Sequence, residues 1–141
     1  MMLDFSSLSK ACASLQESLE VINRYLNNGG SKDQAEYRTF RAGAIQNFEF
    51  TYELSWKALR TWLAENIGKT VVDGITRKEL FRLAAESLLI EDTQQWFDYH
   101  RLRNQTSLTY QESTADEVFE HIDGFVHSAQ TLLLTLNSKN D

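Results

Sequence analysis

The sequence predicts an all-α fold, an up-and-down bundle of four to five helices. Apolar residues recur at spacings of three and four in five segments, and no segment shows the sustained alternation of a half-buried strand. None of the 141 residues is proline, which long helices exclude from their interiors. The connections between the segments are short, which favours antiparallel neighbours. We therefore expect one helical domain over residues 1–141.

The first half of the chain predicts two long helices. The first covers about residues 6–26 and ends before Gly29, because glycine accepts the left-handed backbone that closes helices. The second covers about residues 33–66 and ends at Gly68, which a connector over residues 69–75 follows. Roughly thirty residues at about 1.5 Å each would give a helix of nearly 50 Å, so we expect a bend or break near its start.

Three further helices are predicted to begin at capping boxes. In such a box a Ser, Thr or Asp side chain accepts from a backbone N–H, and a Glu or Gln three residues later reaches back. Boxes of this kind begin at Thr76, Asp92 and Thr114. The last helix should end near Leu136, and residues 137–141 are expected to fray.

The composition limits the classes of function. A formal net charge of −6 argues against a broad nucleic-acid surface but leaves room for a small local site. The single Cys12 and three unpaired histidines predict no metal site, and we expect no cofactor. Apolar stretches stay short of the roughly 20 residues of a membrane span, and the first residues lack signal-peptide features. We therefore expect a cytoplasmic protein that does not enter a membrane.

Charged side chains share one face of the second predicted helix. Glu49, Glu53 and Lys57 follow one another at intervals of four, and Tyr52 belongs to the aromatic stripe beside them. One interpretation is a solvated face with Glu–Lys pairs worth about 0.3–0.5 kcal/mol each. The other is a polar groove in which the acidic side chains orient a basic partner.

The helix that follows Asp92 carries a second polar face. His100, Arg103, Asn104 and Ser107 lie three, four and seven residues apart, which aligns an imidazole, a guanidinium, an amide and a hydroxyl. Arginine suits bidentate phosphate binding, and histidine titrates near neutral pH, so this face could hold an RNA phosphate or a nucleotide. Alternatively, the arginine pairs with one of the two glutamates of the preceding long helix and joins the two helices.

The aromatic residues divide into two groups. Tyr110 lies in a polar run beyond this helix, where we expect its hydroxyl to be accessible. The others are expected to form the core: Trp56, Trp62, Trp96, Phe97, Phe119 and Phe125.

Two stretches of the chain resemble the signature of the nucleotidyltransferase substrate-binding protein family. They read AIQNFEFTYELSWK over residues 44–57 and DYHRLRNQTS over residues 98–107. The resemblance implies a helical bundle of the HEPN superfamily, encoded beside a minimal nucleotidyltransferase that it binds, and forming a homodimer. It also implies kinship with toxin–antitoxin modules. In these the helical member is a ribonuclease, and the nucleotidyltransferase silences it by adding AMP to a tyrosine.

The resemblance assigns roles to individual residues and fails at one of them. The ribonuclease motif has an arginine, a polar residue, a spacer and a histidine, with the modified tyrosine two positions further on. These positions hold Arg103, Asn104, Leu108 and Tyr110, so leucine replaces the histidine that would transfer protons. His100, one turn before Arg103, is the candidate replacement.

Three hypotheses follow. The favoured one is a non-catalytic partner subunit of a separately encoded minimal nucleotidyltransferase, which offers a substrate groove or is itself the target of nucleotide addition. The alternative is a metal-independent ribonuclease toxin that the nucleotidyltransferase neutralises. The third and weakest is a helical adaptor without any link to nucleotides. The sequence specifies neither the donor nor the substrate of the transfer.

Overall fold

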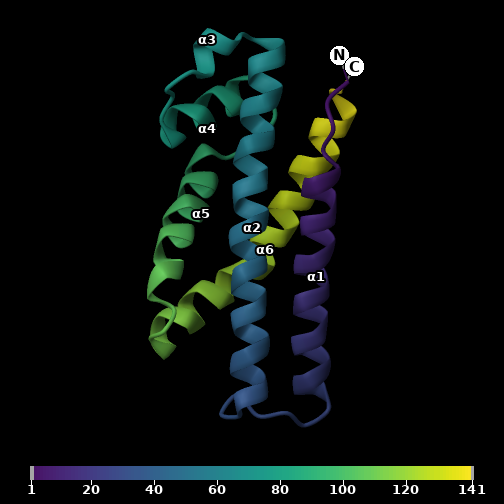
Figure 1. The fold of residues 1–141 in the computed structure, drawn as a ribbon, viewed down its shortest axis with the longest axis vertical. Helices are drawn as coiled ribbons and strands as arrows, with labels where there is room; N and C mark the ends of the chain where they lie inside the picture. The colour runs from purple at the N-terminus through teal and green to yellow at the C-terminus, as the bar shows by residue number, and fades with distance from the viewer. Residues whose placement is uncertain (1, 141) are drawn as a thin grey trace.

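The computed structural model describes residues 2–140 and confirms the all-α bundle, since that range contains helices and no strand (Figure 1). The helices are α1 (Ser6–Asn27), α2 (Ala35–Asn66), α3 (Lys69–Val72), α4 (Arg77–Glu86), α5 (Thr93–Gln105) and α6 (Glu112–Ser138). A single 3₁₀ turn, Thr106–Leu108, follows α5. None of the helices in this part of the chain is long and apolar enough to cross a membrane.

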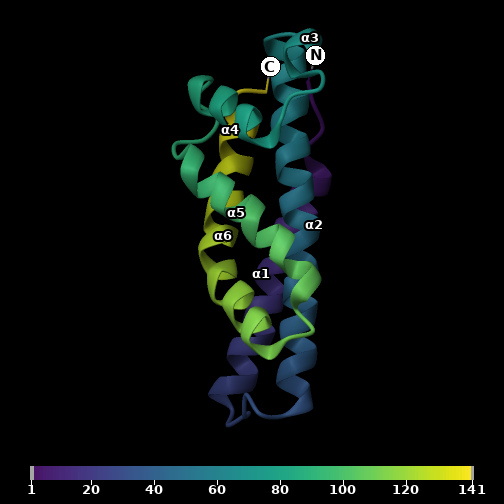
Figure 2. The ribbon, with the colours of Figure 1, turned by 90° about the vertical axis from the view of Figure 1, so that its left-hand side faces the viewer.

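The two helices at the start of the chain, α1 and α2, run antiparallel, and α2 extends beyond α1 toward α3 (Figure 1). The last helix, α6, crosses behind them and packs against both. Figure 2 shows α5 lying over α6 and beside α2, and both of these contacts hold it in place. The short helices α3 and α4 cap the end of the molecule at which both chain termini lie.

The core lies between α2 and α6, against which α1 and α5 each pack. Phe48 is fully buried and meets the ring of Phe125 edge-on, with 4.9 Å between ring centroids. Tyr99 of α5 contacts the same phenylalanine, also with 4.9 Å between ring centroids. Of the six aromatic residues predicted for the core, Trp96 and Phe125 are fully enclosed. The prediction is wrong for the remaining four, which are only partly buried and pack around the margin: Trp56, Trp62, Phe97 and Phe119.

At two of the three predicted capping boxes, all of which fall within residues 2–140, the N-cap hydrogen bond is present, without the return bond from the Glu or Gln side chain. The Thr76 hydroxyl accepts from the backbone N–H of Glu79 at 3.2 Å, and the Asp92 carboxylate accepts from that of Gln95 at 3.1 Å. The third prediction is wrong, because α6 already begins at Glu112 and Thr114 lies inside its first turn.

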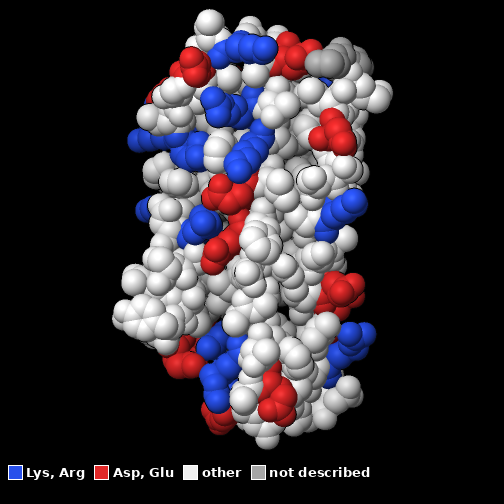
Figure 3. Space-filling view, viewed as in Figure 1, with Lys and Arg blue, Asp and Glu red and all other residues white. Residues whose placement is uncertain are grey.

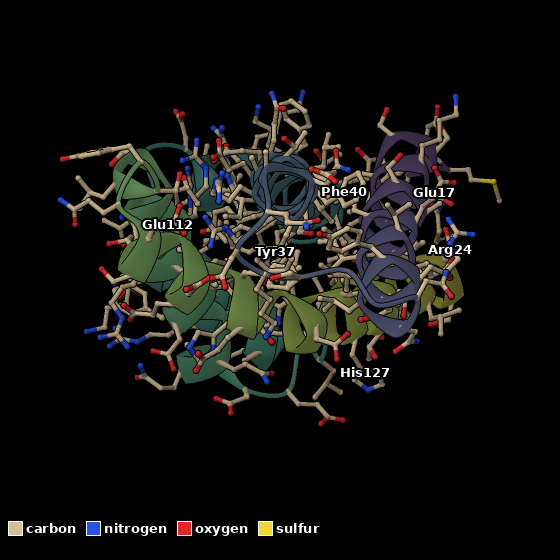
Figure 4. The ribbon with its side chains drawn as sticks, turned by 90° about the horizontal axis from the view of Figure 1, so that it is seen from below. Glu17, Arg24, Tyr37, Phe40, Glu112 and His127 are labelled. Atoms are coloured by element: carbon tan, nitrogen blue, oxygen red, sulfur yellow. The ribbon has the colours of Figure 1, made fainter. Side chains whose placement is uncertain are left out.

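A tertiary contact accounts for the earlier start of α6. Arg41 of α2 is 5% exposed and donates to Asp116 at 2.6 Å and Glu112 at 3.0 Å, both in the first turns of α6. Figure 4 shows this end of the bundle from below, with Tyr37 between α2 and α6 and Phe40 between α2 and α1. The ion pairs hold Glu112 in helical register, two residues before the predicted cap.

The expected break in the second helix does not occur. Helix α2 is continuous over 32 residues, and α1 packs beside it along most of its length. It contains no proline, and its glycine at position 43 leaves the helix intact. The connector after it is also partly helical, since α3 occupies its first four residues.

Residues 137–140 are held in place, contrary to the expected fraying, while residue 141 lies outside the described residues. Helix α6 continues to Ser138, beyond the predicted end near Leu136. The Asn140 side chain then accepts from the Leu3 N–H at 2.8 Å and donates to the Leu3 carbonyl at 2.6 Å. The carbonyl of Lys139 accepts from the indole of Trp62 at 3.2 Å. These bonds join Asn140 to Leu3 and Lys139 to α2.

Two neighbouring phenylalanines of α2 test the described core. We predict that Phe48→Ala lowers the free energy of unfolding by about 3–5 kcal/mol, because it leaves a cavity against Phe125. Phe50→Ala is the matched control and should change it by less than about 0.5 kcal/mol, because Phe50 is 54% exposed. Urea denaturation of both variants measures the difference, and equal losses would contradict the packing.

Candidate functional site

Helices α2 and α5 bring Glu49, Glu53, His100 and Arg103 together in a polar cluster between the two helices, which we call the crevice. The Nε of Arg103 lies 3.4 Å from a carboxylate oxygen of Glu53, and one Nη lies 4.0 Å from Glu49. The interpretation in which the arginine pairs with these glutamates and joins two helices therefore describes the geometry. Figure 3 shows acidic and basic side chains alternating along the middle of this face of the molecule.

Glu53 is the centre of this arrangement. Its second carboxylate oxygen accepts from the Trp56 indole N–H at 3.0 Å, while the first faces Arg103. The guanidinium of Arg103 also donates to the Thr106 hydroxyl at 3.1 Å, which ties it to the end of its own helix. One carboxylate thus orients both an indole of α2 and a guanidinium of α5.

His100 enters the same crevice one turn before Arg103. Its Nδ1 lies 2.8 Å from the hydroxyl of Tyr52, a side chain that is only 1% exposed. Burial raises the pKa of Tyr52, so the phenol stays protonated. The pKa of His100 lies below its ordinary value of 6.5, chiefly through burial and then through the positive charge of Arg77. The imidazole is therefore neutral at pH 7 and can accept a proton.

Arg77 belongs to the crevice, although sequence reasoning missed it. It is the first residue of α4, and its guanidinium carbon lies 3.2 Å above the centre of the Trp56 ring. Its position next to the Thr76 cap indicates only a helix start. The stacking on Trp56 depends on how α3 folds the chain back over α2, and no local pattern signals that contact.

Three predicted site residues lie outside the crevice. Lys57 is exposed and sits over the Trp56 ring at 5.7 Å from its centroid. Asn104 and Ser107 are also exposed, and the Ser107 hydroxyl donates to the Asn104 carbonyl at 3.2 Å. Within residues 2–140, the side chains of these three make no hydrogen bond to Glu53 or His100.

Tyr110 lies between the 3₁₀ turn and α6, away from the core. Its side chain is 78% exposed, and its hydroxyl accepts from the Gln111 side chain at 3.3 Å. Leu108, which stands at the position of the expected histidine, is 46% exposed. The segment therefore presents a phenol to solvent. The part of the chain that the structure describes holds no cluster of His, Cys, Asp and Glu suited to a metal ion.

The fold and the site define a class of protein: all-helical bundles with ion-paired side chains between two neighbouring helices, here α2 and α5. Residues 3–138 match the family model described as nucleotidyltransferase substrate binding protein like. This match spans nearly the whole chain. The chain therefore belongs to the nucleotidyltransferase substrate-binding protein family.

Individual relatives agree with this assignment. The chain is 38% identical over 103 residues to a Haemophilus influenzae protein named probable ribonuclease HepT, a match that covers 72% of this chain and 70% of the relative. A solved Haemophilus influenzae structure, described as the fold of a substrate binding domain of a nucleotidyltransferase, superposes with a TM-score of 0.87 at 32% identity. That alignment covers 95% of this chain and 99% of the other. A Thermus thermophilus structure reaches a TM-score of 0.70 at 27% identity, covering 92% and 98%.

The lowered pKa of His100 makes folding stability depend on pH. Between its folded pKa and 6.5, the unfolded chain binds more protons at this site than the folded chain. We therefore predict that the His100 contribution to the free energy of unfolding is complete above pH 6.5 and is lost as the pH falls through that window. Urea denaturation at a series of pH values measures this.

His100→Asn is the control, because an amide can replace the hydrogen bond to Tyr52 without titrating. The variant should show a flatter dependence between about pH 7 and about pH 5. An NMR titration that places the His100 pKa at or above 6.5 would contradict the described environment.

Proposed function

We propose that this chain is the helical partner subunit of a separately encoded minimal nucleotidyltransferase, and that Tyr110 accepts the transferred nucleotide. The family match over residues 3–138 carries the proposal. The 78% exposure of Tyr110 supports it, because a second protein can reach that hydroxyl without unfolding the bundle. The complex acts in the cytoplasm, where nucleoside triphosphates are abundant and a free Cys12 stays reduced.

The chemistry of the modification needs only a hydroxyl from this chain. The Tyr110 oxygen attacks the α-phosphorus of a nucleoside triphosphate such as ATP. A new P–O bond forms, the bond to pyrophosphate breaks, and the phenolic proton passes to a base on the nucleotidyltransferase. The exposed neighbours Leu108 and Gln111 leave room for the approach of that enzyme.

Charge favours the association. The chain carries a net charge of −6, and its long helices expose many acidic side chains, so a basic partner surface would be attracted over a long range. Attraction of this kind raises the association rate at low salt more than it raises affinity. We expect the complex to form between homodimers of this chain and the nucleotidyltransferase.

Incubation of the chain with its nucleotidyltransferase and ATP tests the acceptor. We predict that the intact mass of the chain increases by one or more AMP groups, and that Tyr110→Phe abolishes the increase. Tyr25→Phe is the matched control and should keep it, because the Tyr25 hydroxyl is already bonded to the Ser31 carbonyl at 2.8 Å. Two proteins that stay monodisperse and separate at micromolar concentrations would refute the partnership.

A second candidate function, a metal-independent ribonuclease, is favoured by the position of His100. A neutral imidazole lies in the same crevice as Arg103, which supplies a base and a phosphate-binding group. His100 would take the proton of an RNA 2′-hydroxyl. The 2′-oxygen would then attack the phosphorus of the adjacent phosphodiester, and the bond from that phosphorus to the 5′-oxygen of the next nucleotide would break. The second copy of the chain, related by a two-fold axis, would protonate that oxygen. A toxin of this kind would be silenced by modification of Tyr110.

Growth and RNA cleavage test this second candidate. If it is right, expression of the chain alone arrests growth, and either Arg103→Ala or His100→Asn relieves the arrest and lowers cleavage by at least about 100-fold. Arg101→Ala is the control on the same helix and should keep activity, because this exposed arginine pairs with Asp98 outside the crevice. Absence of both toxicity and cleavage would eliminate the ribonuclease.

A further inference from the structure

Arg77 carries a charge that the rest of the described chain does not neutralise. Its side chain is partly buried, and its Nε is inaccessible and has no hydrogen-bond partner. Among residues 2–140, the ion pairs of the molecule leave it out. The Nε of Arg103 also lacks a hydrogen bond, but Arg103 lies 3.4 Å from Glu53 and 4.0 Å from Glu49 and so has anionic partners. The enclosed Nε–H of the Arg77 guanidinium has lost hydration that no hydrogen bond or ion pair of the described residues replaces.

The surroundings hold Arg77 in a defined position. The Glu53 carboxylate accepts from the Trp56 indole at 3.0 Å and so sets the plane of the ring. The guanidinium of Arg77 lies flat enough for its central carbon to approach the ring centre at 3.2 Å. When a guanidinium uses its face on an aromatic ring, the N–H donors of its two Nη atoms still point along its edge, even where the Nε is enclosed as it is in Arg77.

Other polar groups converge on the same place from different helices. Arg77 lies close enough to lower the pKa of both Tyr52 and His100, although burial is the larger effect on each. The Tyr52 hydroxyl and the His100 ring are themselves in contact at 2.8 Å. If the Tyr52 hydroxyl donates to Nδ1, the neutral imidazole keeps its proton on Nε2, so α4 and α5 each contribute a group that can donate to an oxygen anion.

We propose that Arg77 anchors a phosphate-binding subsite at the α4 end of the crevice, completed by His100, which takes the phosphate group of a nucleotide or an RNA strand. The planar fork of arginine matches two phosphate oxygens, and the imidazole can donate to a third. The phosphate chemistry rests on the geometry of Arg77 and His100. The choice of a nucleotide or RNA as its source rests on the proposed function.

The charges of the crevice favour Arg77 over Arg103 as the anchor. Arg103 already faces Glu53 at 3.4 Å and Glu49 at 4.0 Å, so a phosphate there would meet two carboxylates. Arg77 stacks on the Trp56 ring, and the indole N–H of that ring, not Arg77, binds the Glu53 carboxylate. The unneutralised guanidinium is therefore the one that gains most from an anion.

Binding to the isolated full-length chain tests the subsite. Inorganic phosphate, AMP and a short 5′-phosphorylated single-stranded RNA are titrated separately, and tryptophan fluorescence and the NMR signal of the Arg77 Nε–H are followed. We expect saturable binding in which Arg77→Gln weakens affinity by about tenfold or more. Arg82→Gln is the matched control on α4 and should bind as wild type, because Arg82 is exposed and paired with Glu79.

A charge-conserving variant separates binding from a structural role. Arg77→Lys keeps the positive charge but lacks the fork, so it should recover only part of the affinity that Arg77→Gln loses. Thermal unfolding of both variants is recorded alongside. If Arg77→Gln binds phosphate, AMP and RNA as tightly as wild type, the subsite does not exist. Lowered thermal stability without any loss of affinity likewise overturns it and makes Arg77 a cover for Trp56.

The same titrations distinguish a mononucleotide from an RNA strand as the molecule that carries the bound phosphate. Tighter binding of AMP than of RNA supports a mononucleotide, and the reverse order supports a strand; inorganic phosphate alone should bind more weakly than the preferred source. Equal affinity for all three restricts the site to phosphate and overturns the nucleotide part of the proposal. Tyr110→Phe should bind phosphate normally. A chain that is never modified at Tyr110 but binds phosphate through Arg77 refutes the proposed function and leaves the subsite intact.

Discussion

The polar crevice depends on one carboxylate, that of Glu53. It faces Arg103 of α5 with one oxygen and binds the Trp56 indole with the other, so α2 and α5 are oriented together. The Arg103 and Glu53 side chains are 31% and 36% exposed, and solvent screening limits such a pair to about 1 kcal/mol or less. Its importance is therefore geometric. The buried core supplies the stability, and this pair determines which groups face one another above that core.

The geometry leads to an uneven distribution of charge in a small volume. Arg103 is balanced by two glutamates, while Arg77 on the other side of Trp56 is balanced by none. Both arginines lower the pKa of His100, after burial, and Glu53 opposes them. The imidazole thus stays neutral beside two cations. This combination of a neutral base and a free guanidinium is uncommon on a solvated helix face, and it favours the interpretation of the face as a binding site.

Local patterns predicted the helices well, and tertiary contacts account for most of what they missed. Spacing indicated α1, α2 and α5 because each buries one apolar stripe, and the caps at Thr76 and Asp92 follow from their own neighbours. The start of α6 could not be predicted in this way, since Arg41 on a distant helix holds Glu112. Spacing also placed Glu53 and Arg103 on polar faces of two helices, and their pairing was one of the two interpretations that it left open. The stacking of Arg77 on Trp56 needed the path of the chain through α3, which no periodicity describes.

Two hydrogen bonds between the Asn140 side chain and the Leu3 backbone hold these residues side by side. They lie at the end of the bundle that α3 and α4 cap (Figure 1). The turn between α1 and α2 lies at the opposite end. A circularly permuted chain, closed by a short peptide across Leu3 and Asn140 and opened in that distant turn, would retain every helix–helix neighbour of the bundle. In such a molecule the first and second helices would no longer be consecutive in synthesis. Whether their antiparallel pairing must form early in folding would then become a question that kinetics can answer.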